Sequence, residues 1–322
     1  MGTQNQSLLI KEINTYDKRS PNIQHNKLIT DNITQQYITK PNPNPNMNPS
    51  NLNDPVQSQD YINQIQKVYE TSPHLHIEII NSLTLPKNTI INIDPFGITN
   101  NNSTRLKRDG FSYFGFTEDL KDNSIDFLIK PKDDQYEEKY LGRHFHIRFN
   151  PYDCKYYIKD LGFGFGTFSK IINGIKIKDN YLINLGNTFL VFMFGSEDMV
   201  SIEDNSVDNV DKILNVRVFS GNGKSEPMSF HPGVKDVLYI GRDPACDVFI
   251  EDNLLSRVHC TLVFGEEYGW VLRDGKNMGI NDEGKSSTNG TWIYLMDETE
   301  IVDGMIFKGN QNLFECRYEY QS

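Results

Sequence analysis

The chain has 322 residues with an ordinary hydrophobic share of 37%, which is long enough for two domains and additional segments. Its formal net charge of −11 argues against nucleic acid or an anionic membrane surface as the main partner. No run approaches the length of about 18 apolar residues that a membrane-spanning helix needs, so we expect no membrane span.

Residues 1–54 form a low-complexity segment rich in Asn, Gln and Pro, with KPNPNPNMNPSNLNDP at its end. Repeated prolines and few aromatic residues leave too little apolar surface for folding alone, so we expect an extended tail. A polar tail of this kind becomes ordered by lying along another protein. Subunits of a large assembly are therefore candidate partners for this segment.

A short amphipathic helix is predicted over residues 55–70. Asp54 is a good N-cap and Pro55 suits the first helical position. Helical spacing places five apolar side chains on one face, namely Val56, Tyr61, Ile65, Val68 and Tyr69. This face either packs on the body of the protein or docks on a partner.

Residues 74–195 predict a β-sandwich, because segments such as HLHIEIINSL and HFHIRFNPYDCKYYIKDL alternate between apolar and polar residues. The pairs His74-x-His76 and His144-x-His146 lie on such strands. No acidic or cysteine ligand falls at a supporting spacing, so we expect exposed histidines and no metal site. Residues 196–208 (SEDMVSIEDNSVD) are predicted to form an acidic linker.

Residues 209–322 predict a second sandwich made of many short strands separated by Gly, Asp or Asn turns. The strand candidates are KILNVRVF, EPMSF, VLYIG, RVHCTLVF, GWVLRD, GTWIYL, GMIFKG and NLFECRYEY.

Three polar signatures interrupt these strands. They are Gly241-Arg242, Ser256-Arg257-x-His259 and Thr288-Asn289-Gly290. Each lies where a strand ends or begins, so we expect a guanidinium, two hydroxyls and an amide on loops at one end of the sandwich. Such a set suits a tetrahedral dianion held together with a neighbouring peptide backbone, because a guanidinium donates two parallel hydrogen bonds to such an anion.

The strand pattern and the three signatures resemble the forkhead-associated (FHA) domain, a β-sandwich that binds phosphothreonine. The resemblance covers residues 209–322. It implies a partner protein that carries phosphothreonine, and it implies phosphopeptide-binding roles for Arg242, Ser256, Arg257, Thr288 and Asn289. It further implies structural roles for Gly241, His259 and Gly290, with His259 bracing the loop of Ser256.

The first sandwich reads as a degenerate copy of the second. An alignment by strand pattern pairs Phe116 with Arg242, Arg143 with Ser256, His146 with His259, Gly164 with Thr288 and Phe165 with Asn289. Phenylalanine cannot offset the desolvation of a phosphate, so we expect this copy to serve packing or protein contact. Arg143 leaves open a positive charge supplied from a different place. The predicted fold class is thus all-β, with two FHA-like β-sandwiches in tandem after the tail and one short helix.

We expect a phosphothreonine-dependent adaptor or scaffold acting through residues 209–322. The alternative is a non-catalytic structural subunit of a large cytoskeletal or ciliary assembly, in which both sandwiches are packing modules. No residue pattern resembles a nucleophile with its base or a cofactor-binding motif, so we expect neither enzymatic activity nor a cofactor. Four well-separated cysteines predict a reduced compartment, the cytoplasm, with the nucleus as the alternative.

Overall fold

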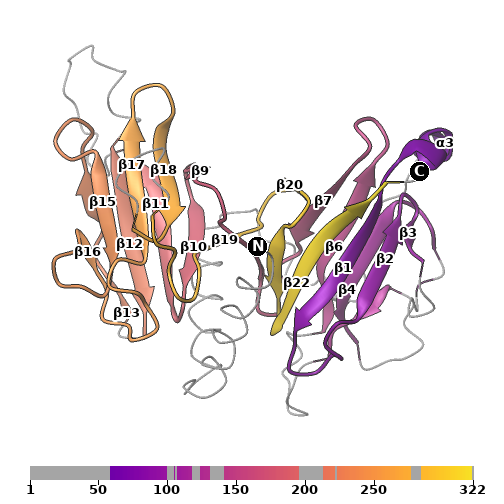
Figure 1. Cartoon of the computed structure of the whole chain (residues 1–322), viewed down its shortest axis with the longest axis horizontal. Coiled ribbons are helices and arrows are strands. Elements are labelled where there is room, and N and C mark those ends of the chain that lie inside the picture. The colour runs from indigo at the N-terminus through magenta and orange to yellow at the C-terminus, as the bar shows by residue number, and fades with distance from the viewer. Residues whose placement is uncertain are drawn as a thin grey trace, which may run out of the picture. The chain divides into compact units, whose positions relative to one another are not determined.

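The chain forms two compact, nearly all-β units (Figure 1). The computed structural model describes residues 59–99, 105, 107–117, 124–130, 141–195, 213–221, 223–276 and 284–320. Within these residues, unit 1 comprises residues 170–294, and unit 2 comprises residues 59–169 together with 295–320. The predicted tail 1–54 and linker 196–208 lie outside the described residues.

The predicted helix is present in unit 2 and packs on the body of that unit. Helix α3 (Gln59–Val68) continues as a single 3-10 turn, η2 (Tyr69–Thr71). Ile65 of α3 is fully buried in the core, and the hydroxyl of Tyr61 donates to the carbonyl of Phe149. The apolar face is therefore used inside the unit. Residues 55–58 of the predicted range are not among those described.

Unit 2 is a sandwich of two sheets. The first has the order β8-β21-β22-β1-β2-β3, with bounds Thr167–Lys170, Ile306–Gly309, Asn312–Glu319, His74–Asn81, Ile90–Asp94 and Gly97–Ile98. The second has the order β20-β7-β6-β4-β5, with bounds Thr299–Glu300, Lys155–Asp160, Gly142–Asn150, Phe111–Phe116 and Phe127–Leu128. Apolar residues from both sheets form one buried core.

Unit 1 repeats this arrangement with other strands. Its first sheet has the order β13-β12-β11-β10-β19, with bounds Gly223–Lys224, Leu214–Ser220, Thr188–Phe194, Tyr181–Leu185 and Trp292–Tyr294. Strand β14 (Met228–Phe230) also pairs with β12. Its second sheet has the order β16-β15-β17-β18-β9, with bounds Val248–Phe249, Val237–Gly241, Cys260–Gly265, Gly269–Asp274 and Ile175–Lys176.

The two units exchange their last three strands. Strands β9–β11 follow β8 in the chain and fall in the predicted first domain, 74–195, yet they complete unit 1. Strands β20–β22 end the predicted second domain, 209–322, yet they complete unit 2. Figure 1 shows the yellow strand β22 beside the indigo strand β1. The compact units therefore differ from the domains expected along the sequence, because the partners of these strands are non-local.

Backbone pairing and burial hold the exchanged strands in place. In unit 2, β22 pairs antiparallel with β1, and Cys316 lies opposite Ile77. In unit 1, β11 pairs antiparallel with β12, and Phe192 lies opposite Val216. The exchanged segments bury Ile183, Leu185, Leu190 and Phe192 in the core of unit 1, and Leu295, Ile301, Met305, Phe307, Phe314 and Cys316 in that of unit 2. Burial of each large apolar side chain stabilises the folded state by about 1.5–3 kcal/mol. Each sandwich would lose several of these side chains from its core without the other half of the chain.

A charged contact fixes the start of the segment that enters unit 2. Arg148 on β6 donates from Nε and Nη2 to the two carboxylate oxygens of Glu298, at 2.7 and 2.6 Å. His146, with Nε2 at 3.7 Å, and Arg148 together lower the pKa of Glu298 to about 2. A bidentate guanidinium–carboxylate pair has a defined geometry, so it fixes the position of this segment as well as stabilising it.

The burial of two histidines contradicts the expectation that they are exposed. His144 and His146 are buried rather than exposed, because β6 is a central strand with both faces covered. Cys260 and Cys316 are fully buried in the two cores, and all four cysteines are free thiols. Among the described residues there is no helix long and apolar enough to cross a membrane.

The strand exchange predicts that the two halves stay together after the chain is cut. A site-specific protease sequence inserted within residues 196–208 separates β1–β11 from β12–β22. Because each unit contains strands from both halves, we expect the cut protein to migrate as one particle in size-exclusion chromatography and to separate only in denaturant. Two independently migrating halves under native conditions would contradict the exchange.

The Glu298 contact predicts a pH-dependent contribution to the stability of unit 2. The depressed pKa means that this contribution is present above the ordinary value of 4.5 and is lost as the pH falls towards 2. Glu298 is 36% exposed, so solvent screening limits the loss in E298Q to about 1 kcal/mol at pH 7. Urea denaturation at pH 7 and pH 3 should show a gap between wild type and E298Q that narrows at pH 3. E300Q is the matched control, because its partner Lys155 is more exposed, and an equal effect of both variants would contradict the assignment.

Candidate functional site

The three polar signatures come together at one end of unit 1. Arg242 directly follows β15, Ser256 lies in the loop before β17, and Thr288 lies in the loop before β19. The backbone N–H of Arg242 donates to the Ser256 carbonyl at 3.2 Å. The N–H of Thr288 donates to Oγ of Ser256 at 3.0 Å, and the two hydroxyl oxygens are 3.3 Å apart. Ser256 is therefore the point at which the three loops join.

Two glycines permit this approach. A Cβ on Gly241 would lie 2.2 Å from the carbonyl oxygen of Arg257, so only glycine lets β15 pass so close to the Ser256 loop. Gly290 has φ of 73°, a conformation that costs other residues energy, and it forms the turn into β19.

His259 connects two of the loops from beneath. It is fully buried; its Nδ1 accepts from the N–H of Ser256 at 3.1 Å, and its Nε2 lies 3.0 Å from the carbonyl of Gly290. These partners assign the neutral tautomer with the proton on Nε2. Burial lowers the pKa of His259, which favours the same neutral form. His259 in this state accepts from one loop and donates to the other.

Asp274 holds the third loop, and sequence reasoning missed it. Its carboxylate accepts from the N–H of Ser287 at 3.0 Å, from Oγ of Ser287 at 2.6 Å and from Oγ1 of Thr291 at 2.7 Å. A Ser and a Thr flanking the Thr-Asn-Gly turn, with an Asp closing the preceding strand, were the available signal. Asn289 also braces this end, because its Nδ2 donates to the Leu254 carbonyl at 2.6 Å.

The charged members of the set face solvent. Arg242, Arg257 and Thr288 are exposed, and Ser256 and Asn289 are partly exposed. Neither Arg242 nor Arg257 forms an ion pair within the described part of the chain. The backbones of the two arginines are close, because the N–H of Asp243 donates to the Arg257 carbonyl at 3.0 Å, so two positive charges belong to one spot on a protein of net charge −11. Together with the hydroxyls this spot can accept an anion that carries several oxygens.

The corresponding end of unit 2 can be located from matching backbone hydrogen bonds. The N–H of Leu161 donates to the His144 carbonyl, just as the N–H of Gly275 donates to that of His259. The expected match of His146 with His259 is therefore wrong by two residues, and His144 is the counterpart. The same shift places Leu141 at the position of Ser256, in place of Arg143. An alignment by alternation could not detect this, because a shift by two keeps every residue on the same face.

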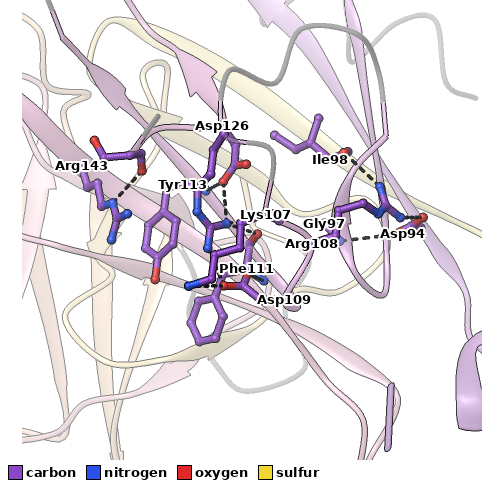
Figure 2. A network of polar contacts seen from close by, with 12 residues as sticks. Asp94, Gly97, Ile98, Lys107, Arg108, Asp109, Phe111, Tyr113, Asp126 and Arg143 are labelled. Carbon is purple, nitrogen blue, oxygen red and sulfur yellow. Dashed lines mark hydrogen bonds and ion pairs between the residues drawn. The ribbon is translucent and has the colours of Figure 1, made fainter. Parts of the chain in front are cut away.

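At the corresponding end of unit 2, Phe116 and Arg143 make contacts inside the unit. Phe116, which stands where unit 1 has Arg242, is buried. Arg143 donates from Nε to the Ser124 carbonyl at 2.8 Å, and its guanidinium lies 3.7 Å from the centre of the Tyr113 ring. Figure 2 shows Arg143 against Tyr113, with Asp109 and Asp126 nearby. These two carboxylates form buried ion pairs with Arg105. The alternative in which Arg143 supplies an accessible charge does not fit this geometry, because only 5% of Arg143 is exposed.

Clusters that could bind a metal are absent from the described residues, where no group of three or more His, Cys, Asp or Glu side chains converges.

Comparison with known proteins finds a family match over part of the chain. Residues 238–308 match the family model of the FHA domain, which confirms the predicted resemblance over that stretch. FHA domains are phosphopeptide-binding modules of protein–protein interaction. The Slr1951 protein from Synechocystis sp. is a similar solved structure, with 21% sequence identity over 31% of this chain and 88% of its own, and a TM-score of 0.16. None of the curated proteins compared matches the chain.

The matched stretch crosses from one unit to the other. Residues 238–294 lie in unit 1, whereas residues 295–308, which include β20 and part of β21, lie in unit 2. The sequence of one FHA domain thus supplies strands to both units, in agreement with the strand exchange.

The neutral state of His259 predicts a pH dependence. Because burial lowers its pKa, His259 stabilises unit 1 fully above the unfolded value of about 6.5, and this stabilisation is lost as the pH falls through the lower folded value. H259L should lower the melting temperature at pH 7.5, because it leaves two polar backbone groups without partners. Scanning calorimetry from pH 7.5 to 5.5 should show a smaller pH-dependent loss in H259L than in wild type. Equal slopes in both proteins would contradict the assignment.

Proposed function

We propose that this protein is a phosphothreonine-dependent binding protein, an adaptor or scaffold that acts through the loop end of unit 1. The observation that carries the proposal is that the backbone of Arg242, whose side chain is exposed and has no ion pair among the described residues, is bonded to Ser256, which in turn meets Thr288. A guanidinium and two hydroxyls can together donate to a phosphate monoester, and the charge of Arg242 does not depend on pH in the physiological range. The proposed partner is a protein that carries phosphothreonine.

Each predicted residue has a role in this proposal. Arg242 and Ser256 bind the phosphate oxygens, Thr288 adds a hydroxyl, and Arg257 adds a second positive charge. Asn289 bonds the peptide backbone beside the phosphothreonine; one hydrogen of its amide already bonds Leu254, so its carbonyl and second hydrogen serve the peptide. The function is binding without catalysis. Four free cysteines support a reduced compartment, and we place the protein in the cytoplasm.

A second candidate follows from unit 2. Its counterpart site contains Phe116 and Leu141 where unit 1 has Arg242 and Ser256, and its arginines are engaged in the interior. We propose that unit 2 is a degenerate FHA-like sandwich that serves packing or protein contact. If both units serve packing, the protein is a structural subunit of a large assembly. In that case Arg242 contacts a carboxylate of a partner or a threonine that is constitutively phosphorylated.

Removal of the Arg242 guanidinium tests the function. The full-length chain and R242A are titrated with a degenerate phosphothreonine peptide library, the same peptides with phosphoserine, and unphosphorylated peptides. Loss of charge-assisted hydrogen bonds to phosphate should weaken binding about 10- to 100-fold in R242A. K224A, which removes an exposed positive charge from β13, should bind as wild type does. Equal binding of phosphorylated and unphosphorylated peptides by wild type would contradict the function and favour the structural subunit.

A further inference from the structure

The turn between β10 and β11 lies against the loop that carries Ser256. This loop, residues 251–256, connects β16 to the start of the Ser-Arg-x-His signature. A Cβ on Gly186 in the turn would lie 3.0 Å from Cβ of Leu254 and 3.5 Å from Cδ1 of Leu255. Gly186 has φ of 59°, and Leu255 is buried. The approach of the turn to the loop is therefore close and leaves no room for a larger residue.

Asp252 bonds the turn and the loop at the same time. Its Oδ1 accepts from the N–H of Leu254 at 2.8 Å, which shapes the loop. Its Oδ2 accepts from the N–H of Asn187 at 3.2 Å and from Oγ1 of Thr188 at 3.1 Å, which attaches the loop to β11. Thr188 is fully buried and Asp252 is partly exposed, so this bond is partly shielded from water. One carboxylate thus joins the recognition loop to an exchanged strand.

The same loop contacts the proposed phosphate site at two of its residues, Leu254 and Ser256. The carbonyl of Leu254, two residues after Asp252, accepts the amide of Asn289 at 2.6 Å. Ser256 follows at the end of the loop and meets Thr288. A hydrogen-bonded path therefore leads from Thr188 through Asp252 and Leu254 to Asn289, and the chain of the loop continues from Leu254 to Ser256.

The hairpin that supports the loop comes from the first half of the chain. We propose that the phosphopeptide site is composite: the exchanged strands β10 and β11 hold loop 251–256 in its binding shape, with Asp252 and Thr188 as positioning residues. This inference rests on the proposed function. Under this proposal the first half of the chain contributes to recognition by supplying the β10–β11 hairpin. Its own counterpart site has Phe116 and Leu141 in place of Arg242 and Ser256.

In unit 2 the turn of the exchanged hairpin also contacts the loops at this end. There the turn between β21 and β22 contains Asn310, whose Oδ1 accepts from the N–H of Phe165 at 3.0 Å. Its Nδ2 lies 2.7 Å from Nδ1 of His144, the counterpart of His259. The two turns thus brace the same end of their units, but they contact different loops.

The test uses the full-length chain and a pair of matched variants. T188V keeps the shape of the side chain and removes the hydroxyl, whereas T188S keeps the hydroxyl and removes only a methyl group. D252N is a second, independent variant, because an amide replaces one of the two acceptor oxygens. Three quantities are measured: the melting temperature, hydrogen–deuterium exchange of the peptide that spans residues 250–258, and Kd for the phosphothreonine peptide library.

We expect T188V and D252N to increase exchange in residues 250–258 and to weaken phosphopeptide binding about three- to tenfold. T188S should match wild type in both measurements, with all four proteins folded at the assay temperature. Unchanged exchange and unchanged Kd in T188V and D252N would overturn the proposal.

The design separates failure of this inference from failure of the proposed function. If wild type binds no phosphopeptide, the proposed function fails, and the composite phosphopeptide site fails with it. If wild type binds and R242A does not, but T188V and D252N bind as wild type does, the function stands and only the positioning role is overturned.

Discussion

Backbone pairing of β11 with β12 in unit 1, and of β22 with β1 in unit 2, is the interaction on which both sandwiches depend. Without these partners, β12 and β1 would each lose one side of their hydrogen bonding next to a buried core, and unpaired buried N–H and C=O groups are costly. Both partners come from the other half of the chain. Neither half of the chain can therefore complete a sandwich by itself, although each unit has a core of its own.

The proposed phosphate site also depends on strand β11, through a short series of contacts. Strand β11 begins at Thr188, which is bonded to Asp252, and the loop of Asp252 leads to Ser256. From the other side, the neutral His259 and the carboxylate of Asp274 fix the loop backbones. The exposed side chains Arg242, Arg257 and Thr288 thus extend from loops whose backbones are held by hydrogen bonds. Such bonding limits the entropy lost when a ligand orders the site.

The two units show how one architecture carries different chemistry. In both, an Asp accepts from the backbone N–H of a Tyr at 2.8 Å, Asp126 from Tyr113 and Asp247 from Tyr239. Around this shared frame, unit 1 exposes Arg242 and Arg257, whereas unit 2 turns Arg105 and Arg143 inward against carboxylates and an aromatic ring. The difference lies in a few side chains at one end, which is why the fold alone does not determine function.

The sequence by itself determined the β class, the amphipathic helix around Ile65 and the three polar signatures around Arg242, Ser256 and Thr288. These are local properties, because alternation, helical spacing and turn chemistry act over a few residues. Only the tertiary structure decided which hairpin completes which sandwich, since β10–β11 and β21–β22 are both short apolar hairpins that follow similar strands. It also revealed the supporting carboxylates Asp252 and Asp274 and the true counterpart of His259. Such roles depend on contacts between residues far apart in the chain, and alternation of period two cannot distinguish a register from one shifted by two residues.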